Sequence, residues 1–203
     1  RYNDRPWIKV APNGTAHLIW NDGSGVLHTV SRDRGATWVL PSHIHDRGGS
    51  SHLAVGPRGE LAVHIIPGAR SGLVCDEGTD LIALSTDAGV TWRKFPAAGG
   101  ARPSGCLNNP RETHRWVDPV AFDRSGALYS LWTDSTGVWL SRAKCDMNGW
   151  TTWRVCSRRG GAPTPYFPYL ASPATGELQA TWVPASRDPR DRHAAPPAFR
   201  REH

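Results

Sequence analysis

The sequence lacks long apolar runs and contains few lysines and few cysteines. No run of about 18 apolar residues exists among the 203, so a membrane-spanning helix is excluded. Only three of the 24 basic residues are lysines, and the 21 arginines are spread along the chain. A net charge of +6 in this scattered form argues against a nucleic-acid surface and leaves open the attraction of anionic ligands such as carboxylated sugars. A GC-rich genome would also produce the arginine excess.

Cysteine is scarce and no C-x-x-C spacing occurs. The even number of four argues for two disulfides in an oxidising compartment and against a metal site. The chain is therefore expected to be secreted, extracellular or periplasmic. Neither an initiator Met nor the apolar segment of a signal peptide is found at Arg1, so we expect a processed chain or a piece of a longer one.

Two octets share one pattern, S-x-D-x-G-x-T-W. Residues 31–38 read SRDRGATW and residues 85–92 read STDAGVTW. The aspartate can accept hydrogen bonds from nearby backbone N–H groups, and the glycine supplies the positive φ of a tight reversal. Apolar segments flank both octets, so each is predicted to connect two strands of a hairpin rather than to catalyse a reaction. The residues given this structural role are Ser31, Asp33, Gly35, Thr37, Trp38, Ser85, Asp87, Gly89, Thr91 and Trp92.

A longer repeat consists of an apolar strand, a turn of the Pro-x-Gly or Asp-x-x-Gly type, and a second apolar strand. Its copies are WIKVAPNGTAHLIW (7–20), HLAVGPRGELAVHI (52–65), PVAFDRSGALYSLW (119–132) and YLASPATGELQATW (169–182). The turn glycines Gly14, Gly59, Gly126 and Gly176 are 45, 67 and 50 residues apart. Such a period is typical of β-propeller blades, which have four strands in about 40 to 50 residues.

The predicted fold class is therefore all-β, a propeller of four-stranded antiparallel blades. Blades are expected at about residues 5–40, 51–96, 116–156 and 166–183, so residues 1–183 would form about 3.5 blades. Residues 184–203 are rich in Pro and Arg without periodicity and are expected to be an irregular or disordered tail. Because closed propellers have about four to eight blades, we expect a fragment whose remaining blades belong to a longer parent chain.

With its octets placed between strands of a repeat, the chain resembles the Asp-box, or bacterial neuraminidase repeat (BNR), proteins of the sialidase superfamily over about residues 4–183. The same box is similar to those of sortilin-type receptors, photosystem assembly factors and xyloglucan hydrolases, so the resemblance bears on fold more than on function. It implies a six-bladed propeller with the boxes on the face opposite the active site.

The resemblance also implies a particular kind of site. Three arginines would hold the substrate carboxylate, an aspartate would act as acid and base, and a glutamate would polarise a tyrosine nucleophile. The Arg-Ile-Pro type segment that supplies the first arginine in the family is absent from this chain. That absence leaves open a truncated chain or a non-catalytic relative.

In such a propeller, the segments that lead into each blade and the loops between second and third strands emerge on one face, the mouth. Arg5, Arg47 and Arg115 precede successive blades, each near an aspartate, and are predicted to bind one anionic group. The alternative is that each Asp–Arg pair only links loops at the rim. The candidate catalytic residues are Asp46 and Asp118 as acid/base, Tyr166 as nucleophile and Glu112 as its partner.

The other polar groups at the mouth give weaker signals. Segment 67–80 carries Asp76, Glu77 and Asp80 and is interpreted as a solvated loop, with binding of a cation or of ligand hydroxyls as the alternative. His43, His45 and His114 lack a further ligand at recognisable spacing, so no metal and no cofactor are predicted.

The same loop geometry suggests how the cysteines pair. Cys75 and Cys106 fall on mouth loops, and Cys145 and Cys156 flank one hairpin. We therefore predict the disulfides Cys75–Cys106 and Cys145–Cys156, which would restrain long loops and one hairpin.

Nine of the ten tryptophans fall into two groups. Those that end second strands or follow box turns are predicted to pack between blades, and those that are less constrained are candidates for sugar stacking. The first group is Trp20, Trp38, Trp92, Trp132, Trp153 and Trp182, and the second is Trp7, Trp116 and Trp139.

Two functions follow from these patterns. The first is a sialidase-like propeller that binds or hydrolyses glycosides, with anionic sugars favoured and exo-sialidase as the type of glycoside hydrolase. The second is a non-catalytic extracellular scaffold that binds protein or polysaccharide. The expected partner is a glycan or glycoconjugate, sialylated ones included, and the sequence leaves open whether the chain is an enzyme.

Overall fold

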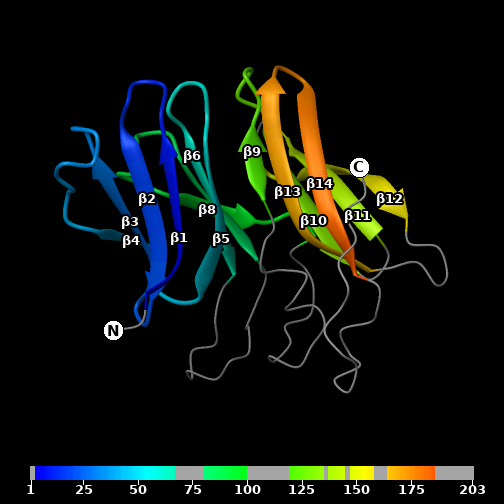
Figure 1. Ribbon diagram of the computed structural model, residues 1–203, viewed down its shortest axis with the longest axis horizontal. Helices are drawn as coiled ribbons and strands as arrows, with labels where there is room; N and C mark the ends of the chain where they lie inside the picture. Colours follow the sequence, from blue (N-terminus) through cyan, green and yellow to red (C-terminus); the bar gives the residue numbers. More distant parts are fainter. Residues whose placement is uncertain are drawn as a thin grey trace.

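The computed structural model describes residues 3–66, 80–99, 119–134, 137–144, 147–157 and 164–185. Their regular structure consists of strands, arranged in three four-stranded antiparallel sheets and one two-stranded sheet (Figure 1). Within these residues no helix has the length and apolar character needed to cross a bilayer. The expected all-β propeller of about three and a half blades is confirmed.

Each sheet is one blade, and its strands follow chain order. Blade one contains β1 (Asn3–Val10), β2 (Ala16–Asp22), β3 (Gly25–Ser31) and β4 (Ser42–His45). Blade two contains β5 (Gly49–Val55), β6 (Leu61–Ile66), β7 (Leu81–Ser85) and β8 (Arg93–Pro96). Blade three contains β9 (Val120–Phe122), β10 (Leu128–Asp134), β11 (Gly137–Ala143) and β12 (Trp150–Ser157). Blade four contains β13 (Thr164–Ala174) and β14 (Glu177–Ala185).

The repeated turn glycines set the geometry of the first hairpin in each blade. Gly14, Gly59, Gly126 and Gly176 have φ values of 84°, 89°, 87° and 71°. Side chains with a Cβ rarely adopt this left-handed region, so the spacing of these glycines fixes where each hairpin reverses.

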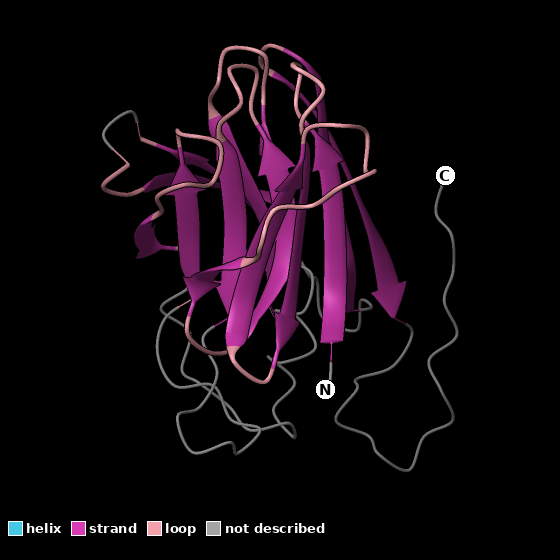
Figure 2. Cartoon of the chain, turned by 90° about the vertical axis from the view of Figure 1, so that its left-hand side faces the viewer, coloured by secondary structure: helices cyan, strands magenta, loops and turns pink. Residues whose placement is uncertain are grey.

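The blades have two distinct ends. The turns between first and second strands and the two Asp-boxes lie at one end, here called the turn end. The turn at residues 22–25 and the connection at residues 45–49 lie at the other, here called the mouth end, where Val26 pairs with His45. Figure 2 shows the strands running between these two ends. Any site at the mouth end is therefore separated from the boxes by the length of a strand.

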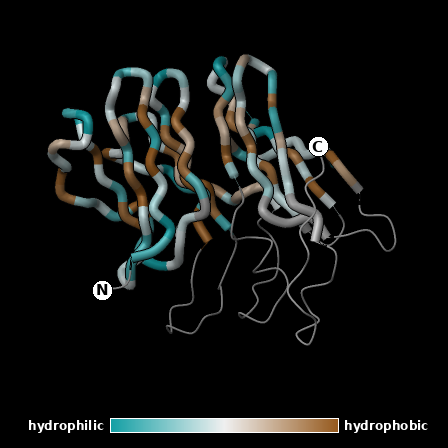
Figure 3. The backbone as a smooth tube through the Cα atoms, in the orientation of Figure 1, coloured by the Kyte–Doolittle hydropathy of each residue, from teal (hydrophilic) through white to brown (hydrophobic). Residues whose placement is uncertain are grey.

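The core consists of three apolar layers, each between successive blades. Ile19 and Val26 of blade one contact the cluster that contains Leu53 of blade two. The next layer joins Ile82 to Val120 and Leu128 of blade three, and the last joins Leu131 to Leu170 of blade four. Because side chains alternate between the faces of a strand, blade two buries both faces, and all six residues of β6 are buried. Figure 3 shows the apolar residues concentrated along the strands.

Blade one leaves exposed the face that each later blade buries against its predecessor. Ile8 and Val10 are 57% and 63% exposed. They lie six and four residues before Gly14, the same positions that Leu53 and Val55 hold before Gly59. Leu53 is fully buried against blade one. The exposed row is thus a packing face without a covering blade in the described part of the chain.

Three of the six tryptophans predicted to pack between blades do not do so, and one of them, Trp20, lies on the outward face of blade one beside Leu18. Trp38 is 39% exposed, and its Nε1 donates to Gly35 O of its own box at 3.2 Å. Trp92, at the same position of the second box, contacts the ring of His28 in blade one edge-on at 5.4 Å. Trp38 lacks such a neighbour because no described blade precedes blade one. Trp153 on the outer strand β12 is 48% exposed, since no further described strand pairs with that edge of the sheet.

Candidate functional site

The mouth end of blade one is built around the turn between β2 and β3. Asp22 Oδ1 accepts hydrogen bonds from Ser24 N at 2.7 Å and from Ser24 Oγ at 2.6 Å. Because the Ser24 hydroxyl donates to Asp22, His43 Nε2 is the donor in its 2.9 Å contact with Ser24 Oγ. Gly25 has a φ of 126°, and a Cβ there would overlap the backbone of residues 45–47. Glycine therefore lets this turn lie directly against the segment that leads into blade two.

Asn21 joins blade one to blade two. Its Oδ1 accepts from Ser50 N at 3.2 Å and from Ser50 Oγ at 3.3 Å. A Cβ on Gly49 would lie 3.2 Å from Arg5 Nη1 and 3.4 Å from Asn21 Nδ2. The Arg5 guanidinium thus lies over the Gly49 backbone, at the junction of the two blades.

Arg5 sits at an irregular point of β1. Its φ is 53°, and the pairing of β1 with β2 shifts register between Asp4 and Trp7. Asp4 stabilises this conformation, because its Oδ1 accepts from Arg5 N at 2.8 Å and its Oδ2 lies 3.4 Å from Arg5 Nε. A positive φ at a residue other than glycine costs on the order of 1 kcal/mol and is typical of functional sites. The Asp4–Arg5 pair joins neighbours in one strand and does not link two loops.

Residues 45–47 add two buried polar atoms to the mouth end. Burial lowers the pKa of His45, as does the charge of Lys94, against the opposing effect of Asp46. His45 Nδ1 lies 3.8 Å from Asp46 Oδ1, and the Asp46 side chain is 85% exposed. Within the described residues, His45 Nε2 and Arg47 Nε are buried without a hydrogen-bond partner. Leaving such atoms unsatisfied costs about 1–3 kcal/mol each, which a ligand or a neighbouring group can offset.

A shallow hollow of about 240 Å³ lies beside Asp4 on the outward face of blade one. Trp20 and Leu18 provide an aromatic and an apolar wall, while Asn3 and Asp4 provide an amide and a carboxylate. Leu18 pairs with Ile8, so the hollow belongs to the packing face of blade one that no described blade covers. Trp20 is thus on a blade-packing face, as its position in the repeat predicts, but no described blade packs against it.

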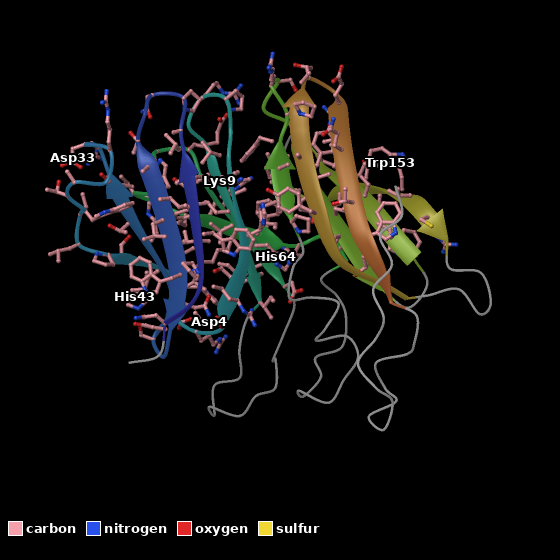
Figure 4. The ribbon with its side chains drawn as sticks, viewed as in Figure 1. Asp4, Lys9, Asp33, His43, His64 and Trp153 are labelled. Carbon is pink, nitrogen blue, oxygen red and sulfur yellow. The ribbon has the colours of Figure 1, made fainter. Side chains whose placement is uncertain are left out.

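The described predicted site residues gather at the mouth end, as Figure 4 indicates for the neighbouring Asp4 and His43. Arg5, Asp46 and Arg47 lie there. Tyr166 lies on β13, where its backbone pairs with Val183, and its side chain is outside the description. Cys156 is an exposed residue of β12. Outside the described residues lie Cys75, Asp76, Glu77, Cys106, Glu112, His114, Arg115, Trp116, Asp118 and Cys145, so both disulfide pairings remain predictions.

Two of the candidates for sugar stacking, Trp7 and Trp139, are half-buried against other side chains. Trp7 lies against the His52 ring with 4.5 Å between centroids. Trp139 stacks on Trp132 at 5.4 Å and carries the Arg154 guanidinium 4.5 Å from its ring centroid. Both faces of the Trp139 ring are thereby engaged, which leaves none for a sugar.

Asp80 was predicted to lie in a solvated loop, but it is buried. Its side chain is 1% exposed, and its Oδ2 lies 3.7 Å from His64 Nε2 on β6. The signal in the sequence was the apolar run that follows directly, LIAL, which begins β7 and carries Asp80 into the sheet. A buried carboxylate next to a buried histidine is an electrostatic pair that spacing alone does not reveal.

The two Asp-boxes use their carboxylates inside the turns. Asp33 accepts from Thr37 N at 2.9 Å, from Thr37 Oγ1 at 2.5 Å and from Ser31 Oγ at 2.7 Å. Asp87 accepts the same set from Thr91 and Ser85. The hydrogen bonds from Thr37 and Thr91, the largest cause, lower the pKa of each carboxyl to about 2. Figure 4 shows Asp33 well away from Asp4 and His43.

Metal chemistry has no support in the part of the chain that the structure describes. No group of three or more His, Cys, Asp or Glu side chains there is arranged to hold an ion.

Comparisons with known proteins bear on the fold. Neither the protein-family models nor the curated proteins gave a match. Among solved structures, Bacteroides ovatus xyloglucan PUL GH43B is 16% identical with a TM-score of 0.53, covering 99% of this chain and 41% of its own. The leech intramolecular trans-sialidase is 14% identical with a TM-score of 0.53, covering 89% and 28%. A variant of the NanB sialidase of Streptococcus pneumoniae is 10% identical with a TM-score of 0.54, covering 89% and 27%.

Likeness at these identities shows the fold, which is that of a sialidase-like propeller. The chain spans about two fifths of the length of the Bacteroides protein and little more than a quarter of the two sialidases.

Proposed function

We propose that the mouth end of this chain binds a glycan that carries a carboxylate, as part of a larger sialidase-like propeller. The observation that carries the proposal is the presence of two arginines at the junction of blades one and two. Arg5 lies over Gly49. Arg47, two residues before Gly49 in the sequence, has a buried Nε with no hydrogen-bond partner among the described residues.

The choice of a carboxylate follows from the chemistry of arginine. A guanidinium donates two parallel N–H groups to the two oxygens of a carboxylate, and its planar fork loses little freedom in doing so. An anion at this junction would offset the cost of the unsatisfied Arg47 Nε. The similar solved structures include two sialidases, which supports a sialic acid as the first ligand to test.

Binding is tested on the full chain with N-acetylneuraminate and, as the uncharged comparison, lactose. Arg47→Ala should weaken N-acetylneuraminate binding by about 10- to 100-fold, the range for a lost charge-assisted hydrogen bond, and leave lactose binding unchanged. The matched control is Arg32→Ala, which removes the same charge from an exposed residue in the first box at the turn end. Calorimetry that gave equal affinities for both variants would exclude Arg47 from the site.

Hydrolysis is a separate and finer proposal. Asp46 would act as the acid/base, with Asp118 as the other candidate, and Tyr166 would attack the anomeric carbon with Glu112 as its partner. Arg115 would be the third arginine. A neutral Tyr–Glu pair meets less repulsion from an anionic sugar than a carboxylate nucleophile would. An exo-sialidase of this type would release 4-methylumbelliferone from its sialoside, and Asp46→Asn and Tyr166→Phe would each abolish the release.

A binding scaffold is the alternative, and the same measurements distinguish it. Saturable N-acetylneuraminate binding that depends on Arg47, together with no release of fluorophore by the longer parent protein, would establish a glycan-binding propeller without catalysis. If the parent protein neither bound N-acetylneuraminate nor released the fluorophore, the glycan proposal as a whole would be rejected.

A further inference from the structure

The four inner strands bring repeat-equivalent residues together around the propeller axis. Counting back seven positions from each turn glycine gives the aromatic layer, and counting back five gives the lysine layer. The aromatic layer is Trp7, His52, Pro119 and Tyr169, and the lysine layer is Lys9, Ala54, Ala121 and Ala171. Inner-strand side chains two apart point to the same side, so the two layers stack along the axis.

The lysine layer contains an open space. A cavity of about 220 Å³ lies between β1, β5, β9 and β13 and is lined by Lys9, His52 and Tyr169 together with the three alanines. Alanine stands where blade one has a lysine, and three methyl groups do not fill the volume opposite one long side chain. The cavity is thus a direct result of one unequal position in the repeat.

His52 makes one wall of the cavity and is poorly satisfied there. It is 2% exposed, and its ring lies 4.5 Å from that of Trp7 and 5.7 Å from that of Tyr169 between centroids. Its Nδ1 is buried with no hydrogen-bond partner in the described residues. Burial, and then the charge of Lys9, lower its pKa to about 4, so the imidazole is neutral at physiological pH.

Lys9 supplies a positive charge to the same space. It is partly buried, and none of the ion pairs found between described residues gives it a carboxylate. The titratable groups that line the cavity with it are His52 of blade two and Tyr169 of blade four, and its lining contains no Asp or Glu among the described residues. A partly buried ammonium that has no counter-charge among the described residues favours binding of an anion.

We infer that this axial pocket binds a small carboxylate, held by the Lys9 ammonium against the aromatic layer. One ammonium beside a neutral imidazole and a phenol matches a single negative charge rather than a phosphate dianion. The pocket is distinct from the mouth end, because Lys9 lies four residues beyond Arg5 on β1, about 13 Å at 3.3 Å per residue. The inference does not depend on the proposed glycan function.

The test is an acetate titration of the full chain at constant ionic strength, followed through the imidazole ¹H–¹⁵N resonances of His52. We expect a saturable shift, because an anion between Lys9 and His52 changes the field at the imidazole. Lys9→Met should weaken acetate binding by at least about tenfold, the effect of losing the charged partner. Lys94→Met, which removes an equal charge from outer strand β8, should leave it unchanged.

A second variant separates loss of binding from loss of folding. Ala54→Leu keeps Lys9 but fills the cavity, so it should also abolish the acetate shift while thermal unfolding remains cooperative. A saturable shift that survives in both Lys9→Met and Ala54→Leu would overturn the proposal, as would an absent shift in the unmodified chain. Chloride that bound as tightly as acetate would overturn the assignment of a carboxylate.

The source of the carboxylate is decided by a further arm with N-acetylneuraminate. A Lys9-dependent shift of His52 with this sugar acid supports a carboxylated sugar as the ligand, whereas a shift with acetate alone supports a free small acid. Arg47→Ala should leave the His52 response to acetate intact, so failure of the mouth-end proposal and failure of this one give different results.

Discussion

At the scale of single residues, the two boxes are nearly identical turns in different surroundings. Gly35 and Gly89 have φ values of 91° and 88°. A Cβ on Gly35 would meet only the edge of Trp38 at 4.0 Å, whereas a Cβ on Gly89 would overlap the His28 ring of blade one. The pair therefore offers a built-in comparison between backbone strain alone and strain combined with a clash between blades.

We predict that Gly89→Ala destabilises the protein more than Gly35→Ala does. Both substitutions force a residue with a Cβ into the left-handed region, which costs about 1–2 kcal/mol of stability. Only Gly89→Ala also forces His28 to move, which adds about 1–3 kcal/mol as overpacking does elsewhere. Urea unfolding of the two variants measures the difference directly, and equal free energies of unfolding would show that the blade contact is easily relaxed.

The sequence predicted the residues whose roles are local and missed those whose roles depend on distant neighbours. The hydrogen bonds of the box join residues within a few positions of one another, so the pattern around Asp33 contained all of its partners. The exposure of Trp38 depends on which blade lies beside it, and the burial of Asp80 depends on His64 across the sheet. An octet pattern holds no information on either.

At the scale of strands, a histidine pair links β2 to β3 inside blade one. His17 Nδ1 lies 3.1 Å from His28 Nε2, and His28 also contacts Trp92 of blade two. Burial lowers the pKa of both rings, with a further contribution from Arg32 at His17 and from His17 at His28, where it reaches about 4. A hydrogen bond between two imidazoles requires that at least one be neutral.

We predict that the protein loses stability as the pH falls from about 6.5 to about 4. Because the folded pKa of His28 lies below the unfolded value of 6.5, the unfolded chain binds the proton first, and the loss levels off below the folded pKa. The lowered pKa of His28 corresponds to a loss of at most roughly 3 kcal/mol in the free energy of unfolding.

Urea unfolding at pH 7 and pH 4.5 measures this loss. His28→Gln should reduce the difference between the two pH values, whereas His43→Gln, at an exposed position, should not. An unchanged pH dependence in His28→Gln would assign the loss to other groups.

At the scale of the whole molecule, the repeat made the architecture predictable and left the site largely open. Turn glycines recur with the blades, so the order of strands follows from counting along the chain. The mouth end is built from segments that do not repeat, and their contacts arise only once blades are placed side by side. Gly49 beneath Arg5 is one example, since nothing in the sequence around either residue joins them.

The double burial of blade two has a consequence for native-state hydrogen exchange. β6 is buried at every position and lies between β5 and β7, while blade one and blade four are each covered on one face. Amide protection should therefore be highest in β6 and β7 and fall outward toward β1 and β14. This is expected when each blade is stabilised by its contacts with neighbouring blades. Exchange followed by mass spectrometry would measure this gradient, and uniform protection across the blades would mean that they open as one cooperative unit.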